Sequence, residues 1–284
     1  MTTHWLRDRG WRHLVALLAI AFSLIPIVFI VSSAFNPLGT LSSTSLFPTN
    51  GFSLDNFAKL FSDTDFGLWY RNTLMIAGIA GFVSILLSSL AAYAFSRFRF
   101  AGRRVSLLSL LLIQMFPQFL AIVAIFLIFT EVSDYWPAVG FNTPGGLILV
   151  YLGGALGVNT WLMKGFFDTV PKELDESAVM DGATHAQIYF RIILPLVTPI
   201  IAITSLLTVI GMVNEFIMAS VFLTDSSEKT LAVGLAGMVA ANTREAQYGM
   251  FCVGTLLTAI PTVGTFLLLQ RYIVHGLTGG AVKG

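Results

Sequence analysis

The segment that is most informative about the fold reads Glu176-Ser177-Ala178-Val179-Met180-Asp181-Gly182-Ala183, and Ile193-Leu194-Pro195 follows it. This polar segment lies between two long hydrophobic stretches of the chain. Gly182 separates two short sequences that favour helix, and glycine is the residue that most often ends a helix. The sequence therefore predicts a helix, a glycine turn and a second helix in the connection between two hydrophobic spans.

The first predicted helix has an acidic start and an apolar side. Pro171 suits the first turn of a helix, where its missing N–H is not needed. Three acidic residues within 173–176 are favourable at the positive end of the helix dipole. Leu174 and Ala178 are one turn apart, so we expect them to share a face.

The second predicted helix begins at Thr184, which has the capping-box spacing to Gln187. Ile188 and Ile192 share a face of it. An apolar face on a short exposed helix lies on the membrane or fits a groove in a partner. Residues 164–195 carry five acidic and three basic side chains, which suits an anionic inner leaflet poorly. This favours a protein partner, and an interfacial helix without a partner remains the alternative.

The composition predicts an all-α, polytopic membrane protein. Hydrophobic residues make up 56% of the 284 residues, charged residues make up 11%, and the mean hydropathy is +0.81. Stretches of about 20 uncharged residues are long enough to cross a bilayer as helices. We expect a single transmembrane domain over residues 1–284, with spans at about 14–33, 73–95, 105–129, 146–163, 196–222 and 250–271.

Positive charge predicts the orientation. With the N-terminus inside, 12 of the 16 Lys and Arg residues face the cytoplasm and 4 face out. Both termini are then cytoplasmic, together with the loop 164–195 and the tail 273–284, whereas the loops 36–71 and 224–249 are external. Four prolines lie within or near spans, and each is either a kink or simply tolerated; they are Pro26, Pro117, Pro199 and Pro261. We interpret the single cysteine, Cys252, as a packing residue.

The fifth span contains the polar pair Asn214-Glu215. A carboxylate in hydrocarbon is costly, so Glu215 should face the bundle interior, near Asn214, Gln114 or Tyr151. Three roles stay open for it: a satisfied structural carboxylate, a polar group of a gate or cavity, and a proton relay. The relay would make the protein a proton-coupled secondary transporter.

The segment that opens this section resembles the EAA loop of ABC importer permeases. Ser177 departs from the pattern, in which Ala is usual, but Ser is nearly as small. Residues 93–102 are similar to the loop after the second span of sugar permeases. Further segments resemble the MalG-type permeases of maltose/maltodextrin ABC importers, in the binding-protein-dependent sugar permease family; they are residues 114–117, 140–146, 151–154, 230–234 and 276–284. No G-x-x-x-x-G-K-[ST] phosphate loop occurs, so the chain is not the ATPase itself.

The resemblance implies a six-helix type I permease that imports maltose, maltodextrin or a related α-glucoside by alternating access. Another di- or oligosaccharide, such as trehalose, is the alternative substrate. The implied partners are a larger homologous permease subunit, two ATPase subunits and a periplasmic sugar-binding protein, within the membrane and without nucleic acid. The chain is expected to be a transport subunit without catalytic residues, metal or cofactor, because the partner ATPases bind ATP and Mg and hydrolyse the ATP.

The resemblance also assigns residues to these contacts. The residues implied to couple to the ATPase are Leu174, Glu176, Ser177, Ala178, Asp181, Gly182 and Ala183. Gly280, Val282 and Lys283 belong to a tail that is implied to reach between the ATPases. Gly237, Asn242 and Arg244 lie in the external loop that is implied to meet the binding protein. No residue is assigned to the sugar.

Overall fold

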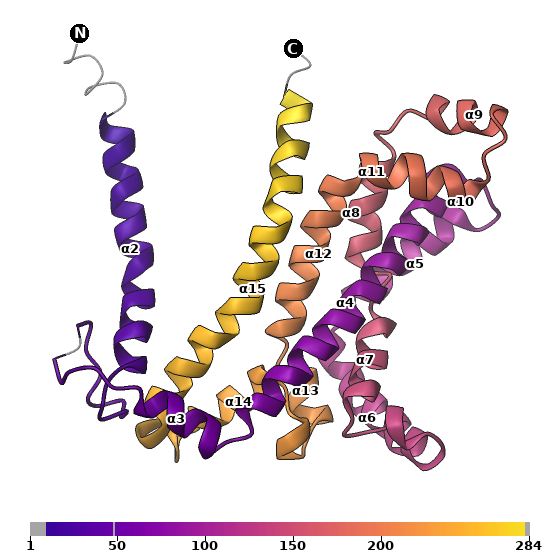
Figure 1. Ribbon diagram of the computed structural model, residues 1–284. Coiled ribbons are helices and arrows are strands. Elements are labelled where there is room, and N and C mark those ends of the chain that lie inside the picture. The colour runs from indigo at the N-terminus through magenta and orange to yellow at the C-terminus, as the bar shows by residue number, and fades with distance from the viewer. Residues whose placement is uncertain (1–9, 48, 282–284) are drawn as a thin grey trace, which may run out of the picture. The chain divides into compact units, whose positions relative to one another are not determined.

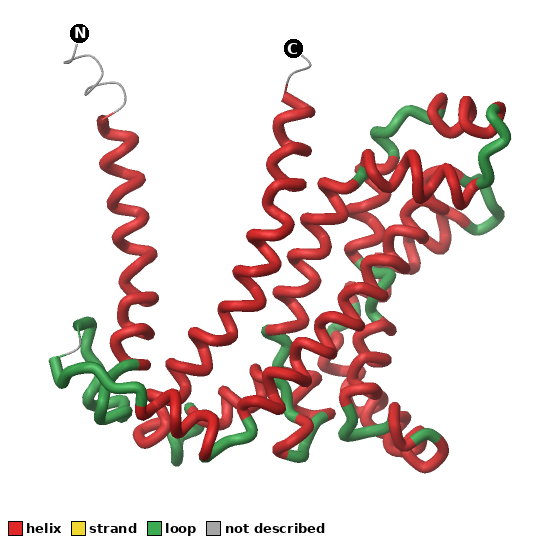
Figure 2. Tube along the Cα trace, in the orientation of Figure 1, coloured by secondary structure: helices red, strands yellow, loops and turns green. Residues whose placement is uncertain are grey.

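The computed structural model describes residues 10–47 and 49–281, and this part of the chain consists of helices and loops without a strand (Figure 2). The predicted all-α fold is therefore confirmed. The elements, in chain order (Figure 1), are α2 (Trp11–Ala34), α3 (Asp55–Ser62), α4 (Phe66–Arg97), α5 (Arg103–Met115), α6 (Gln118–Tyr135), η2 (Pro137–Val139), α7 (Pro144–Gly153), α8 (Val158–Phe167), α9 (Glu173–Met180), α10 (His185–Gln187), η3 (Ile188–Ile193), α11 (Leu194–Leu196), α12 (Thr198–Val213), α13 (Ile217–Phe222), η4 (Ser226–Glu228), α14 (Leu231–Met238) and α15 (Arg244–Ala281).

The long apolar helices agree with the six expected spans. Among the described residues, α2, α4 and α15 are each long and apolar enough to cross a membrane. Three pairs of shorter helices pass the same test jointly but are bent at a break, which gives up to six spans by length and composition. The third and fourth expected spans are therefore broken helices, whereas the sequence predicts them as continuous. The third bent pair, residues 185–196 with 198–213, breaks at the start of the expected fifth span, and that span is interrupted again between α12 and α13.

Proline accounts for two of these breaks. α5 and α6 meet at 100° beside Pro117, which precedes the first residue of α6. The helix that ends at Leu196 meets α12 at 79°, and Pro199 lies in the first turn of α12. A proline ring clashes with the carbonyl four residues earlier, so a helix is interrupted there. Pro26 and Pro261, by contrast, lie inside the continuous helices α2 and α15 and are tolerated.

The break in the fourth span is rich in glycine. α7 and α8 meet at 52° across the segment 154–157, and Gly153, Gly154 and Gly157 lie in or next to it. The Ser88 hydroxyl of α4 donates to the Ala155 carbonyl at 2.6 Å, which satisfies a backbone group that the break releases. A Cβ on Gly157 would lie 1.9 Å from the amide nitrogen of Gln114, so a larger residue here would require the Gln114 side chain to move.

Contacts divide the chain into two compact units, residues 1–67 with 234–259, and residues 68–233 with 260–284. In the first unit, the buried amide of Asn56 donates to the carbonyls of Ala34 at 3.0 Å and Asn36 at 2.9 Å. The Gly249 N–H donates to the Gly39 carbonyl at 2.9 Å. Cys252 is buried in this unit and forms no disulfide within the described chain, as the packing interpretation predicts.

The second unit contains two buried hydrophobic clusters. The elbow cluster joins the end of α4 and α8 to the segment 170–197, and its fully buried members include Met163, Phe167, Ile188 and Ile193. The second cluster surrounds α13 and centres on Phe222, with Leu147 from α7 and Ile76 from α4. Figure 1 shows α9 displaced from α10 and α11 and joined to them by a short loop.

Candidate functional site

The segment that the sequence singles out folds as helix, glycine turn and helix, as predicted. α9 ends at Met180, and Gly182 follows with a φ of +81°, in the left-handed region. The Gly182 N–H donates to Val179 and the Ala183 N–H donates to Ala178, both at 2.9 Å. These two bonds form a Schellman motif, which satisfies carbonyls at the end of the helix. A Cβ at Gly182 would meet no atom within 4 Å, so glycine is favoured by its backbone conformation and not by lack of space.

The second helix starts with the expected capping box. Gln187 N–H donates to the Thr184 hydroxyl at 3.3 Å, and Thr184 N–H donates to the Gln187 side chain at 2.8 Å. α10 continues directly into the π-helical turn η3, in which Ile188 is buried. Pro171 differs from the prediction: it lies before Lys172, the residue that precedes the first turn of α9, because α9 begins at Glu173. We call residues 173–193 the elbow.

The inner side of α9 is held by packing and by one ion pair. Ala178 is 7% exposed and belongs to the elbow cluster. Arg97, the last residue of α4, places Nε 3.0 Å from Oδ2 of Asp175, and these side chains are 5% and 16% exposed. The two atoms have no hydrogen-bond alignment, so the contact is an electrostatic one. A second nitrogen of Arg97 donates to the Val170 carbonyl at 3.0 Å. Arg97 thus fixes both α9 and the segment just before the elbow to α4.

A second polar link, beside the elbow, connects α4 to the end of α8. Ser96 donates to Asp168 at 2.7 Å, and the Lys164 ammonium lies 2.5 Å from the other oxygen of Asp168. Burial would raise the pKa of the Asp168 carboxyl, but the hydrogen bonds from Lys164 and Ser96, with the charges of Lys164 and Arg103, outweigh it and lower the pKa below its usual value. This carboxylate therefore stays ionised at neutral pH and links α8 to α4.

α9 also exposes three apolar side chains, which lie among exposed acidic and polar residues. Met180 is 86% exposed, Val179 is 50% exposed and Leu174 is 41% exposed. The exposed acids Glu176 and Asp181 lie on the same short helix and its end. Leu174 and Ala178 are both in α9, four residues apart as predicted, but Ala178 packs inward whereas Leu174 stays exposed. Exposed apolar side chains on a short helix are suited to docking in a groove of a partner.

The structure thus separates the predicted coupling residues by role. Ala178 packs into the elbow cluster and Gly182 forms the turn. The others stay exposed or half-buried; they are Leu174, Glu176, Ser177, Asp181 and Ala183. The sequence analysis did not assign Arg97 or Tyr93, which contact Asp175 of α9 from α4, or Ser96, which contacts Asp168 at the end of α8. The basic loop after the second predicted span was the available signal, but Asp175 lies 78 positions after Arg97 in the sequence.

Glu215, the carboxylate that the sequence predicts to lie in the membrane, is at the break between α12 and α13. Tyr151 donates to Oε2 of Glu215 at 2.7 Å, as one of the expected partners. The N–H groups of Met218 and Ala219, in the first turn of α13, donate to the two Glu215 oxygens at 2.8 and 2.9 Å. Glu215 therefore accepts hydrogen bonds from the free N–H groups at the start of α13 and, through Tyr151, links α13 to α7. Asn214 is exposed and donates to the Ile210 carbonyl of its own helix, so it is not a partner of Glu215.

A cavity of about 520 Å³ surrounds this carboxylate. Its polar lining includes Gln114, Tyr151 and Glu215, and Phe116 contributes an aromatic ring. These residues come from the breaks of the third, fourth and fifth spans. The geometry agrees with two of the open interpretations, a structural carboxylate and a polar group of a cavity.

The structure describes the predicted external residues and only part of the predicted tail. Gly237, Asn242 and Arg244 are all exposed and lie at one turn between α14 and α15, where the Thr243 hydroxyl donates to the Gly237 carbonyl at 2.8 Å. Gly280 is helical, because α15 runs beyond the expected end of the sixth span to Ala281. The helix continues because each internal glycine costs only about 1 kcal/mol. Val282 and Lys283 lie outside the described residues.

A family model described as "Binding-protein-dependent transport system inner membrane component" matches residues 84–278, and the chain belongs to this family. The protein is a membrane-embedded permease component of an ABC importer that works with a substrate-binding protein, and it is not itself an enzyme. This removes the proton-coupled transporter from the candidate functions.

Particular relatives are similar over nearly their whole length. The maltose/maltodextrin transport system permease protein MalG of Vibrio vulnificus (strain YJ016) is 37% identical over 292 residues, covering 98% of this chain and 97% of the relative. MalG of Escherichia coli (strain K12) is 36% identical, with 96% and 95% covered. The maltodextrin permease protein MdxG of Bacillus subtilis (strain 168) is 37% identical, with 91% and 90% covered.

The fold matches a solved transporter. A chain from the crystal structure of a bacterial ABC transporter involved in the import of the acidic polysaccharide alginate superposes with a TM-score of 0.76 at 22% identity, covering 96% of this chain and 99% of that chain. A structure of a bacterial alginate ABC transporter in complex with an alginate pentasaccharide-bound periplasmic protein gives 0.68 at 15% identity, with 94% and 96% covered. At these identities the likeness concerns the fold.

Proposed function

We propose that this permease subunit imports maltose, maltodextrin or a related α-glucoside. The observation that carries the substrate assignment is the full-length likeness to maltose and maltodextrin permeases at 36–37% identity. Another di- or oligosaccharide, such as trehalose, remains the alternative substrate. The pore would be completed by a larger homologous permease subunit.

We further propose that the elbow docks on one of two ATPase subunits, which bind ATP and Mg in place of this chain. The exposed apolar side chains of Leu174, Val179 and Met180 would enter a groove of the ATPase, and Glu176 and Asp181 would meet basic groups at its border. The inner side of α9 is fixed to α4 by Arg97 and to the elbow cluster by Ala178. A displacement of the docked helix would therefore move α4 as a rigid body, which is how ATP-driven closure can change access to the pore.

This proposal includes the orientation with both termini in the cytoplasm. The elbow and the tail residues Gly280, Val282 and Lys283 are then on the ATPase side. The exposed turn with Gly237, Asn242 and Arg244 is on the opposite side and would meet the sugar-loaded binding protein.

Site-specific crosslinking tests the docking. Met180 is 86% exposed, and Phe61 of α3 is 57% exposed. In the full complex, Met180→Cys should crosslink to the ATPase and Phe61→Cys should not. An impermeant thiol reagent added outside should label only Phe61→Cys. Crosslinking from Phe61→Cys alone, or outside labelling of Met180→Cys, would refute the proposed orientation.

Uptake in vesicles that contain the assembled complex tests the substrate. Labelled maltose should be taken up with ATP inside, and unlabelled maltotriose should compete more strongly than trehalose. Stronger competition by trehalose would support the alternative substrate. Asp181→Lys should lower both ATPase assembly and uptake because it reverses a charge on the docking border.

A further inference from the structure

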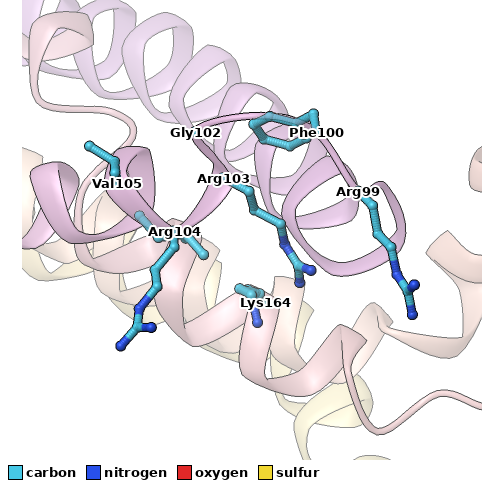
Figure 3. Close-up of a pocket in the computed structure, with 8 residues that line it drawn as sticks. Arg99, Phe100, Gly102, Arg103, Arg104, Val105 and Lys164 are labelled. Carbon is cyan, nitrogen blue, oxygen red and sulfur yellow. The ribbon is translucent and has the colours of Figure 1, made fainter.

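A second cavity, of about 560 Å³, lies where α5 begins, and its lining is strongly basic. Four cationic side chains line it, three from the segment 99–104 and Lys164 from α8. Figure 3 shows the charged ends of Arg99, Arg103, Arg104 and Lys164 directed to the same side of the view. No function described above uses this cavity, which we call the basic pocket.

The positive charge of the basic pocket is only partly neutralised by the part of the chain that the structure describes. Lys164 has its carboxylate, Asp168, at 2.5 Å. The charge of Arg103 also reaches Asp168 and contributes to the low pKa of that carboxyl. None of the three arginines forms an ion pair with a described acidic residue. The Arg103 Nε is buried and has no hydrogen-bond partner, although a buried charged donor without a partner is costly.

The start of α5 adds to this imbalance. Gly102, with a φ of +83°, precedes the helix and provides no side-chain cap, and no acidic residue lies in the first turn. Arg103 and Arg104 instead occupy the first two helical positions. Cations are unfavourable there because free N–H groups make the N-terminus of a helix positive. Helix N–H groups and arginines together are the donors that bind phosphate in proteins.

An apolar stripe continues from the basic pocket along α5. Val105, which lines the pocket, is 68% exposed, and Leu108 and Leu112 are 48% and 66% exposed. The spacings of three and four residues place these side chains on one helix face. α5 is the first half of the bent third span, so this face extends from the pocket into the membrane. The ligand should therefore carry a phosphate at one end and a hydrocarbon chain at the other.

We propose that the basic pocket binds the phosphate-bearing headgroup of an anionic phospholipid. The phosphate accepts hydrogen bonds from Arg103 and from the free N–H groups at the start of α5, and Arg99 and Arg104 add attraction. One acyl chain lies along Val105, Leu108 and Leu112. The inference does not depend on which sugar is transported. Basic pockets beside membrane helices bind anionic headgroups in this manner.

Lipid binding to the full chain tests the proposal. The purified chain in a neutral detergent should bind fluorescent phosphatidylglycerol saturably and phosphatidylcholine weakly. Each arginine near an anionic surface contributes about fivefold in affinity, so Arg103→Gln with Arg104→Gln should weaken phosphatidylglycerol binding ~30-fold. Arg191→Gln is the matched control, since Arg191 is exposed in η3 outside the pocket, and it should leave binding unchanged.

Other outcomes would overturn the proposal. Equal loss of binding in Arg191→Gln would show a general charge effect and no built site. Displacement by inorganic phosphate at the concentration at which phosphatidylglycerol competes would identify a free anion as the ligand. Loss of lipid binding when the ATPase and the sister permease assemble would assign the basic pocket to a protein partner. If the double variant fails to fold, Arg103→Lys with Leu108→Gln, which keeps the charge and breaks the apolar stripe, should still weaken phosphatidylglycerol binding.

Discussion

Two carboxylates in the second unit are satisfied in different ways. Asp175 of the elbow meets a charged partner, Arg97, which comes from another helix. Glu215, at the break in the fifth span, accepts hydrogen bonds from the neutral donors Tyr151 and two backbone N–H groups. The ion pair joins two helices that are remote in sequence, whereas most of the Glu215 bonds stabilise the local start of α13. The carboxylate of Asp175 thus couples a movement of α9 to α4, whereas the carboxylate of Glu215 stabilises a helix that begins after a break.

Breaking the ion pair of the elbow should have the largest effect. Arg97→Leu leaves the Asp175 carboxylate buried without a counter-charge, and such losses cost about 3 kcal/mol. We expect a lower free energy of unfolding for the purified chain and a loss of sugar-stimulated ATP hydrolysis in the complex. Thermal unfolding and ATPase assays measure these two quantities.

The double variant Arg97→Leu with Asp175→Leu is the matched control. It removes the unpaired charge and should recover most of the stability but not the coupling, because the directed contact between α4 and α9 is absent. Full recovery of coupling would mean that the elbow cluster alone positions α9.

Removal of the Glu215 carboxylate should have the second largest effect. Glu215→Ala leaves two N–H groups of α13 and the Tyr151 hydroxyl without their acceptor, which should lower the free energy of unfolding by about 2 kcal/mol. The neighbouring cavity can admit water to these groups, so the effect should stay below that of Arg97→Leu. Tyr151→Phe removes one bond and should cost roughly half as much. Thermal unfolding of the three proteins checks this order, which fails if Tyr151→Phe is the more damaging change.

The glycine turn should rank third. A β-branched residue in the left-handed conformation is disfavoured by about 1–2 kcal/mol, so Gly182→Val should fray the end of α9. Asparagine tolerates this conformation, and Gly182→Asn should retain most of the activity. Hydrogen exchange of the α9 amides and ATP-driven uptake measure the effect. Equal activity of the valine and asparagine variants would argue against a conformational role of Gly182.

The smallest effect should be a pH dependence at Asp168. Its pKa is lower in the folded protein, so the ionised carboxylate adds stability above its unfolded pKa near 3.8, and this stability is lost as the pH falls through the folded pKa. The side chain is partly exposed, which limits the contribution to below about 1 kcal/mol. Asp168→Asn should therefore lower the melting temperature slightly at pH 7 and converge with the unsubstituted protein on acidification. A constant difference between pH 7 and pH 3 would contradict this.

Local chemistry predicted most of the elbow. Gly182, the Thr184–Gln187 capping box and the acidic start of α9 act over a few residues, so the sequence specifies them. The breaks in the spans were partly predictable: helices break at Pro117 and Pro199 but continue through Pro26 and Pro261, because a helix can continue where neighbouring groups satisfy the released backbone. Gly153, Gly154 and Gly157 lie within a hydrophobic run, and they indicated the break in the fourth span, but the span prediction did not use them.

The sequence by itself determined the helical class, the number of hydrophobic segments and the turn of the elbow, because hydropathy, charge and turn preferences depend on neighbouring residues. Only the tertiary structure decided which groups meet: Arg97 with Asp175, Tyr151 with Glu215, and four cations around one cavity. These residues lie tens of positions apart, so their contacts depend on how bent helices pack, and no local pattern encodes that packing.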